Sequence, residues 1–244
     1  DIRKYKFKAL LKYENKFSNN SEIKPNIIKI RKSIKSLDPK IKKAIDFAKA
    51  FDIAICHDAA YSEVTFDGYE APSFMQTPGA IDVGIEFHSL SKTYNMTGWR
   101  IGTAVGNSTL IDGLLRVKSN LDSGISQAVQ YMGIEALENI TPEWINSNND
   151  IYKKRRDRMV EVLNGIGLVV PTPKAGLYVW AKCPEGWTSA ELASELLEKH
   201  SVVVTPGRGY GEYGEGYIRL SLTTPDDRVE EGLSRLSGAM LEKS

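Results

Sequence analysis

Two apolar runs flank a short polar stretch that carries a single lysine, Lys92. Residues 84–87 form the first run and residues 101–105 the second, and small hydroxylated residues lie between the first run and the lysine. Short apolar runs bounded by turn residues are typical of strands. The pattern therefore predicts strand, tight loop and strand, with Lys92 presented just beyond the end of the first strand.

The residues around Lys92 suit an amine nucleophile beside a bound phosphate. Ser89 precedes the lysine by three residues, and Arg100 follows it by eight, between Gly98 and Gly102. A lysine amine can condense with a carbonyl cofactor. A serine hydroxyl and an arginine can bind a phosphate, the arginine through forked, charge-assisted hydrogen bonds. The alternative is a surface loop with an ordinary lysine and arginine.

A second polar group follows the apolar residues 53–56, which predict a buried parallel strand. The group contains His57, Asp58 and Tyr61. Ligands of open α/β sheets bind outside the carboxyl ends of strands, and an aspartate there can hold a ring nitrogen in its protonated form. For Asp58 the alternative is a helix N-cap with a packed tyrosine. His57 is expected to be a core histidine with a satisfied partner.

One arginine, Arg219, interrupts the apolar strand predicted for residues 217–222. A charged side chain inside a buried strand is costly unless it has a partner. Arg219 is therefore a candidate to hold an anionic ligand, and an internal salt bridge is the alternative.

Residues 88–100, His-Ser-Leu-Ser-Lys-Thr-Tyr-Asn-Met-Thr-Gly-Trp-Arg, resemble the cofactor-lysine motif of the class I/II aminotransferases. These are fold-type-I enzymes that use pyridoxal phosphate (PLP). The Asp-x-x-Tyr of residues 58–61 matches the same family pattern. The resemblance implies that Lys92 carries PLP, that Asp58 pairs with its pyridinium nitrogen and that Tyr61 hydrogen-bonds its ring oxygen. It also implies that other residues contribute to cofactor or substrate binding, namely Ser89, Ser91 and Arg100 for PLP and Arg219 for the substrate α-carboxylate.

The motif strings are most similar to the LL-diaminopimelate aminotransferase branch of this family. That likeness implies transfer of an amino group between an amino acid and a 2-oxo acid, in lysine biosynthesis, by a cytoplasmic homodimer. The fold it implies is α/β, the three-layer PLP-transferase fold type I. Residues 41–150 would form a partial large domain with a mostly parallel sheet, and residues 151–244 a small α/β C-terminal domain.

The front of the chain departs from the family pattern. Family members carry a glycine-rich phosphate loop, an aromatic residue that stacks on PLP and an Asn-Pro-x-Gly loop before the aspartate. The first glycine here is Gly68, and no Asn-Pro-x-Gly occurs. Glycines allow the close backbone approach that a phosphate loop needs. We therefore expect a partial chain with weakened PLP affinity and reduced activity on its own.

Charge sets the beginning of the chain apart. Residues 1–43 hold 12 lysines and 2 arginines against 4 acidic residues, whereas the remainder holds 18 basic and 27 acidic residues. We treat residues 1–40 as a separate basic segment. A solvated basic helix is favoured over a nucleic-acid arm, so no nucleic-acid partner is expected. Two alternatives to a transaminase remain, a non-catalytic regulatory module that uses this segment and a carbon–sulfur lyase on the same scaffold.

Composition excludes several other classes. No run of 18 apolar residues occurs, so no transmembrane helix is expected. Cys56 and Cys183 lie far apart and predict two packed thiols in a reducing compartment. No metal site is expected.

The remaining elements follow from periodicity and caps. Helices are predicted from Pro39, over 108–119 and 124–137, from Pro142 to about 163, over 188–200 and from 224 onward. Strands are predicted at 168–170, 177–181 and 202–205, and a glycine-rich loop at 206–216. The basic cluster at 153–156 is expected on the solvent face of its helix.

Overall fold

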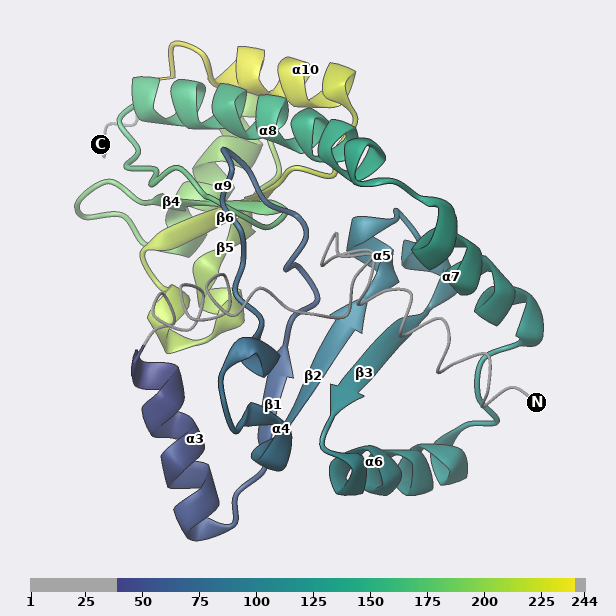
Figure 1. The fold of residues 1–244 in the computed structure, drawn as a ribbon. Helices are drawn as coiled ribbons and strands as arrows, with labels where there is room; N and C mark the ends of the chain where they lie inside the picture. Colours follow the sequence, from purple (N-terminus) through teal and green to yellow (C-terminus); the bar gives the residue numbers. More distant parts are fainter. Residues whose placement is uncertain (1–38, 240–244) are drawn as a thin grey trace. The chain divides into compact units, whose positions relative to one another are not determined.

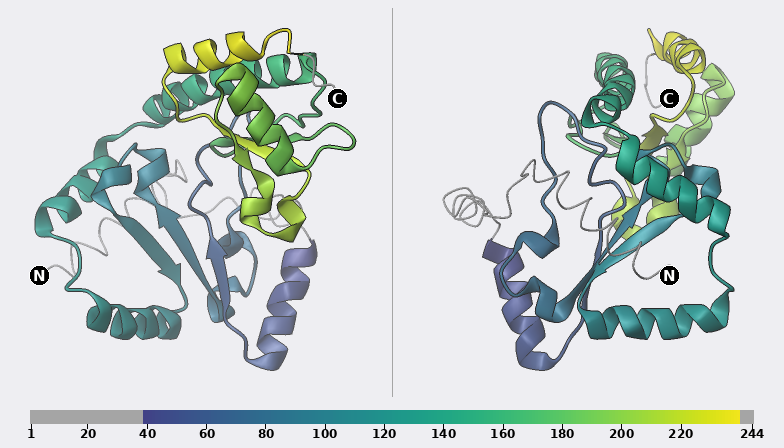
Figure 2. Two further views of the ribbon diagram at one scale, coloured as in Figure 1. Left: turned by 180° about the vertical axis from the view of Figure 1, so that it is seen from behind. Right: turned by 45° about the vertical axis from the view of Figure 1, so that its right-hand side comes forward.

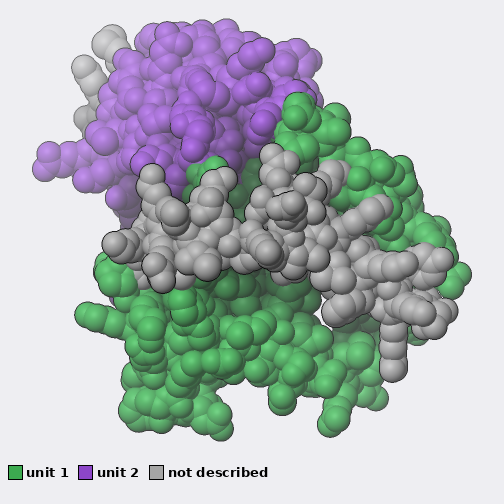
Figure 3. Space-filling view, in the orientation of Figure 1, with its two compact units in different colours: residues 1–63, 70–145 green, residues 64–69, 146–244 purple. Residues whose placement is uncertain are grey.

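A computed structural model describes residues 39–239 (Figure 1), so the basic segment, predicted to be a solvated helix and not a nucleic-acid arm, lies almost entirely outside the described residues. The chain divides into two compact units (Figure 3). Of the described residues, unit 1 comprises 39–63 and 70–145, and unit 2 comprises 64–69 and 146–239. Within residues 39–239, no helix is both long and apolar enough to cross a membrane.

The sheet of unit 1 has three strands in the order β1 (Ile55–Asp58), β2 (Gly84–Ser89), β3 (Gly102–Gly106). They lie side by side in both Figures 1 and 2. β1 pairs with β2 in parallel, and β2 pairs with β3 antiparallel. The described part of the sheet is therefore mixed and not mostly parallel. The reason is local, because the short connection through residues 90–101 turns the chain straight back beside β2.

The strand predicted at residues 53–56 lies two residues later, and it is not fully buried. Its residues alternate between half-buried and exposed, and Ile53 before it is 45% exposed. β1 pairs with β2 alone among the described strands, so its other edge has no ladder. Cys56 is consequently an exposed free thiol, contrary to the expected packing, whereas Cys183 is buried.

The helices of unit 1 begin at the residues that cap chemistry favours. α3 (Pro39–Phe51) starts with proline, whose missing N–H costs nothing in a first turn. Asn107 caps α6 (Ser108–Leu121) by accepting hydrogen bonds from two backbone amides, and Ser126 caps α7 (Gln127–Asn139). Two shorter helices, α4 (Ala80–Val83) and α5 (Leu90–Thr93), and two 3-10 turns, η1 (Phe74–Gln76) and η2 (Thr97–Trp99), complete the unit. The helix α8 (Pro142–Gly165) follows.

Two apolar clusters pack around the strands of unit 1. One joins Ile45 of α3 to Phe74 and Ala80. The other joins Leu90 and Tyr94, on either side of Lys92, to Ala136 of α7. Burial raises the pKa of the Tyr94 phenol well above its ordinary value, and the nearby charge of Glu63 adds to the effect. The second cluster therefore holds the lysine-bearing turn against α7.

Unit 2 contains an antiparallel sheet in the order β4 (Tyr178–Lys182), β6 (Tyr217–Ser221), β5 (Thr205–Pro206). Its helices are α9 (Ser189–His200) and α10 (Asp226–Leu236). Thr188, the first residue of the helix predicted at 188–200, is the N-cap of α9 and forms a capping box with Glu191. Within the loop predicted at 206–216, two 3-10 turns form, η3 (Gly207–Tyr210) and η4 (Glu212–Gly214).

Two predicted strands of unit 2 are shorter than expected, because backbone N–H groups at their beginning donate hydrogen bonds to carbonyls at the ends of the preceding helices. The N–H of Val202 donates to Leu196 O at the end of α9, and only Thr205–Pro206 join the sheet. Likewise Leu168 N donates to Leu163 O at the end of α8, and residues 168–170 make a single bridge from Val169 to Lys182.

The prediction of a solvent-facing basic cluster on α8 is wrong for Arg156. Its side chain is 2% exposed and pairs with Asp67 at 2.7 Å and Asp157 at 2.6 Å. It also donates to Pro173 O at 2.8 Å and lies 4.8 Å from the centroid of the Phe66 ring. A buried guanidinium needs such partners, and residues 64–69 supply two of them, Asp67 and Phe66, from a distant part of the sequence.

Candidate functional site

The predicted lysine lies on the one-turn helix α5, directly beyond the end of β2. Ser89, the last residue of β2, caps this helix by accepting a hydrogen bond from Ser91 N at 3.3 Å. The same hydroxyl oxygen accepts a hydrogen bond from Lys92 Nζ, also at 3.3 Å. The lysine amine is therefore held at the strand end, half-buried, beside a serine hydroxyl.

Tyr61 faces the same amine from the segment that follows β1. Lys92 Nζ lies 5.3 Å from the centroid of the Tyr61 ring, within the range of a cation–π contact. Asp58 ends β1 in register with Phe87 of β2, and its Oδ1 accepts a hydrogen bond from Ala60 N at 3.2 Å. The side chain of Asp58 is exposed at this edge of the sheet. Parallel pairing of β1 and β2 thus places both polar groups at the same end of the sheet.

Arg100 lies at the end of the turn that leads into β3. Its φ of 53° is left-handed, an uncommon conformation for a residue with a side chain. The exposed guanidinium donates to Thr97 O at 3.0 Å, and Thr97 Oγ1 in turn donates to Ser91 O at 3.2 Å. Ser91 itself is buried. The lysine turn and the arginine turn are therefore tied together through Thr97.

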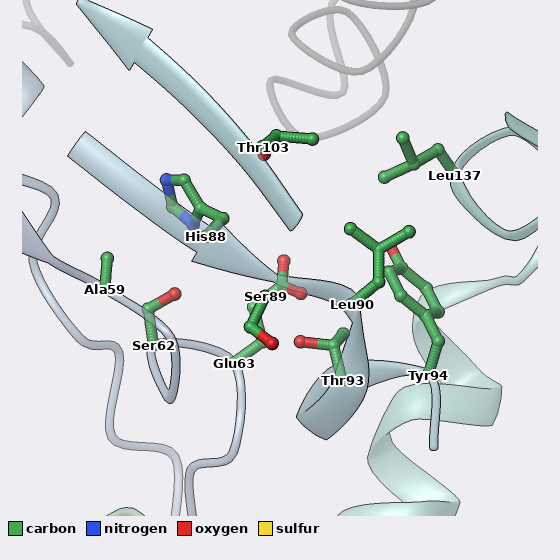
Figure 4. Close-up of a pocket in the computed structure, with 10 residues that line it drawn as sticks. All are labelled: Ala59, Ser62, Glu63, His88, Ser89, Leu90, Thr93, Tyr94, Thr103 and Leu137. Carbon is green, nitrogen blue, oxygen red and sulfur yellow. The ribbon is translucent and has the colours of Figure 1, made fainter. Parts of the chain in front are cut away.

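A small pocket adjoins the Ser89 end of β2 (Figure 4). Its walls come from the segment after β1, the end of β2 with α5, β3 and α7. The residues that line it are Ala59, Ser62, Glu63, His88, Ser89, Leu90, Thr93, Tyr94, Thr103 and Leu137. Most of these side chains carry hydroxyl, carboxyl or imidazole groups, so the pocket offers polar contacts next to the lysine turn.

Arg219 belongs to unit 2 and lies in the middle of β6. Its guanidinium carbon is 3.9 Å from the centroid of the Tyr178 ring and 4.3 Å from that of the Tyr210 ring. Within residues 39–239, neither a hydrogen bond nor an ion pair to this guanidinium is present. The internal salt bridge considered as an alternative is thus not found there, and the stacked guanidinium keeps its N–H donors for other groups.

Sequence reasoning did not anticipate a buried carboxylate next to the site. Glu86, in the middle of β2, is 1% exposed and binds both His57 and His88. His57 thus has the satisfied partner that was expected, but its side chain is 36% exposed and does not lie in the core. The sequence contained a sign of this group, because an acidic residue within an apolar strand requires partners.

Comparison with known proteins gives the family. The model for aminotransferase class I and II matches residues 38–236. An LL-diaminopimelate aminotransferase from Dehalococcoides mccartyi is 60% identical over 197 residues, or 81% of this chain and 50% of that protein. The corresponding protein from Moorella thermoacetica is 53% identical over 195 residues, or 80% of this chain and 50% of that protein. The chain thus spans about half the length of the curated relatives it matches.

Solved structures agree with the sequence match. The structure of a probable N-succinyldiaminopimelate aminotransferase from Thermus thermophilus matches with a TM-score of 0.75 and 34% identity. The match covers 82% of this chain and 54% of that chain. The predicted α/β fold class and the resemblance inferred from residues 88–100 are confirmed. The chain belongs to the class I and II aminotransferases, a family of PLP-dependent enzymes.

Proposed function

We propose that this chain carries the lysine-bearing part of a PLP-dependent aminotransferase, which moves an amino group between an amino acid and a 2-oxo acid. The observation that carries the proposal is the position of Lys92. Its half-buried amine lies 3.3 Å from Ser89 Oγ and 5.3 Å from the centroid of the Tyr61 ring. A hydroxyl and a phenol beside one amine match the donor set expected from the family motif.

The described residues fit PLP in their chemistry. Lys92 offers an amine for the carbonyl, Ser89 and Arg100 offer donors for the phosphate, and Tyr61 offers a phenol for the ring oxygen. Asp58, exposed at the end of β1, offers a carboxylate for the ring nitrogen. Ser91 contributes through the backbone, since its N–H bonds Ser89 Oγ and its carbonyl accepts from Thr97. When bound, PLP supplies an electrophilic carbonyl carbon and an electron-withdrawing ring.

The proposed roles of the residues follow from their chemistry. The Lys92 amine holds the cofactor and, once released, moves a proton at the substrate Cα. Asp58 keeps the ring nitrogen protonated, because a nearby anion favours the charged form of a base. Ser89 and Arg100 bind the phosphate through charge-assisted hydrogen bonds. Apart from the bond between the Lys92 amine and the cofactor carbonyl, each role assigned to the protein is therefore a proton transfer, a hydrogen bond or an ion pair made by a named side chain.

Arg219 is proposed to bind the substrate carboxylate. Its guanidinium lies over the rings of Tyr178 and Tyr210, and within residues 39–239 no hydrogen bond or ion pair occupies its N–H donors. An arginine edge binds a carboxylate through two parallel hydrogen bonds. The absence of an ion pair to Arg219 within residues 39–239 supports this role.

The names of the relatives support a more specific substrate. LL-diaminopimelate is proposed as the amino donor, in lysine biosynthesis, and 2-oxoglutarate is proposed as the acceptor from the family resemblance. The whole enzyme is proposed to be a homodimer, as is typical of the family. A cytoplasmic location is proposed from the two free thiols. The alternative of a regulatory module depends on the basic segment outside the described residues.

The experiment that tests the proposal is site-specific capture of PLP. The chain is incubated with PLP, reduced with borohydride and digested, and mass spectrometry locates the labelled lysine. We expect Lys92 to be labelled at the lowest PLP concentration. Lys92→Ala should lose this label, and Lys118→Ala, which removes an exposed lysine of α6, should keep it. Equal labelling of several exposed lysines, unchanged in Lys92→Ala, would contradict the proposal.

A further inference from the structure

The proposed chemistry gives no role to Glu86, a buried ionisable group of unit 1. Glu86 lies in the middle of β2, and its side chain is 2% exposed. Removing a carboxylate from water is costly unless hydrogen bonds or opposite charges replace the lost hydration. The surroundings of Glu86 therefore need explanation.

Both carboxylate oxygens of Glu86 accept several hydrogen bonds. Oε2 accepts from Phe74 N at 2.8 Å and lies 2.8 Å from His57 Nδ1. Oε1 lies 2.7 Å from His88 Nε2. The Ser73 hydroxyl lies 2.9 Å from both oxygens. One carboxylate thus joins β1, β2 and the turn before η1.

The two histidines stand directly next to proposed site residues. His57 precedes Asp58 at the end of β1, and His88 precedes Ser89 at the end of β2. The backbone continues the link, because Ala59 N donates to Phe87 O at 2.8 Å. Any shift of β1 against β2 at this end would change the separation of Asp58 from Ser89 and from the lysine that Ser89 contacts.

We propose that Glu86 is a positioning residue, which locks the carboxyl end of β1 to β2 through His57, steadies the end of β2 through His88, and so holds Asp58, Ser89 and Lys92 in place for the cofactor. The proposal rests on the proposed function of Lys92. Glu86 itself acts at a distance, since its oxygens are already occupied by protein donors.

The charge of Glu86 supports this role. Burial alone would raise the pKa of the Glu86 carboxyl, but the hydrogen bonds from His88, His57 and Ser73 outweigh it and lower the pKa to about 2. The carboxylate is therefore ionised at neutral pH. Hydrogen bonds to an ionised group are stronger than those between neutral groups, so the lock is stiffer than a neutral side chain would make it.

The test compares Glu86→Leu, which removes all acceptors, with Glu86→Gln, which keeps the shape and one acceptor oxygen. Amide deuterium exchange is measured in peptides covering residues 57–62 and 86–93, and PLP capture on Lys92 is timed in the same samples. The matched control is Glu215→Gln in unit 2. Glu215 also accepts three hydrogen bonds, from Ser189 N, Ser189 Oγ and Gly216 N.

We expect exchange in the two peptides to rise about tenfold in Glu86→Leu, as loss of hydrogen bonds to a charged group implies. Glu86→Gln should fall between Glu86→Leu and the wild type, and capture of PLP should slow in the same order. The control should leave both peptides unchanged. If Glu86→Leu does not fold, Glu86→Gln serves as the test, provided that its circular dichroism spectrum matches that of the wild type. Its exchange in the two peptides should still exceed the wild-type value.

Two outcomes would overturn the lock. One is wild-type exchange in both peptides of the Glu86 variants. The other is a uniform rise throughout unit 1, including α6, which indicates general destabilisation only. The proposed function has its own test, and it fails if PLP does not label Lys92 in the wild type. The two failures can be told apart, because the exchange measurement needs no cofactor.

Discussion

Asp67 Oδ2 lies 2.7 Å from Nη1 of the buried Arg156 and so fastens the segment 64–69 to α8 within unit 2. Backbone hydrogen bonds continue the attachment, from Phe66 N to Lys174 O and from Gly176 N to Val64 O. The segment thus belongs to unit 2, although residues on both sides of it along the chain belong to unit 1.

Replacing Arg156 by Met should lower the free energy of unfolding by about 2 kcal/mol, because three hydrogen-bonding partners and the Phe66 contact are lost together. Asp67→Asn should cost less, since Arg156 keeps Asp157 and Pro173 O. Lys154→Met, at the exposed neighbour, should change little. Urea unfolding gives the three values, and equal effects at positions 154 and 156 would refute the assigned role.

The contact between Asp67 and Arg156 shows where prediction from sequence stopped. A run of four basic residues on a polar helix favours a solvent-facing surface, and Lys154 does face solvent. Arg156 is buried only because residues near Asp67 fold back onto α8, and no local pattern encodes that contact. Helix starts were predictable for the opposite reason, since Asn107 and Thr188 cap amides within three residues of themselves.

Ser89→Ala should weaken the site in two ways. The side chain caps Ser91 N and accepts from Lys92 Nζ, so its loss frees one backbone donor and the lysine amine. We expect a loss of about 1 kcal/mol in unfolding free energy and slower capture of PLP by Lys92. Ser89→Thr keeps the hydroxyl and is the control. Capture in Ser89→Ala at the wild-type rate would argue against phosphate binding by Ser89.

Glu86 should make the chain sensitive to acid. Its pKa of about 2 in the folded chain lies below its ordinary value of 4.5, so the ionised form stabilises the folded state above pH 4.5. This contribution, about 3 kcal/mol, disappears as the pH falls from 4.5 toward 2. Urea unfolding between about pH 7 and about pH 3 measures the greater part of it, about 2 kcal/mol. In Glu86→Gln the free energy of unfolding should fall less between neutral and acidic pH than in the wild type. An equal fall in the two proteins would contradict the lowered pKa assigned to Glu86.

The site was only partly predictable, because some of its contacts join segments that are distant in the sequence. Lys92, Ser89 and Tyr61 follow strand ends, and parallel strands bring such residues to one edge of a sheet. The Glu86 network needs the register of β1 on β2, which opposes His57 to Glu86. A short sequence pattern does not determine which residues face each other across two strands separated by a long connection.

The two cysteines should react at very different rates. Cys56 is exposed, whereas Cys183 is buried, and burial together with the charge of Glu215 raises the pKa of the Cys183 thiol. The thiolate is the reactive form, so Cys183 is slowed by both access and ionisation. A thiol-specific disulfide reagent at neutral pH should therefore show one fast and one slow phase. Cys56→Ala should remove the fast phase, and persistence of that phase would place the exposed thiol elsewhere.

Tyr178 should determine how well Arg219 binds a carboxylate. The guanidinium contacts both the Tyr178 and the Tyr210 ring, so removal of one ring gives the side chain more freedom and adds an ordering cost to binding. Binding is measured as the increase in melting temperature that 2-oxoglutarate gives. Tyr178→Leu should weaken the apparent affinity about fivefold, which corresponds to one cation–π contact of about 1 kcal/mol.

Tyr178→Phe is the matched control, because it keeps the stacked ring and removes only the hydroxyl. Arg219→Met should abolish the effect of 2-oxoglutarate, and Arg219→Lys should not restore it, since an ammonium lacks the planar fork that binds a carboxylate twice. If 2-oxoglutarate stabilises Arg219→Met as much as the wild type, the carboxylate binds elsewhere. In that case the stacked arginine serves only the packing of β4 and β6 with the tyrosines around it.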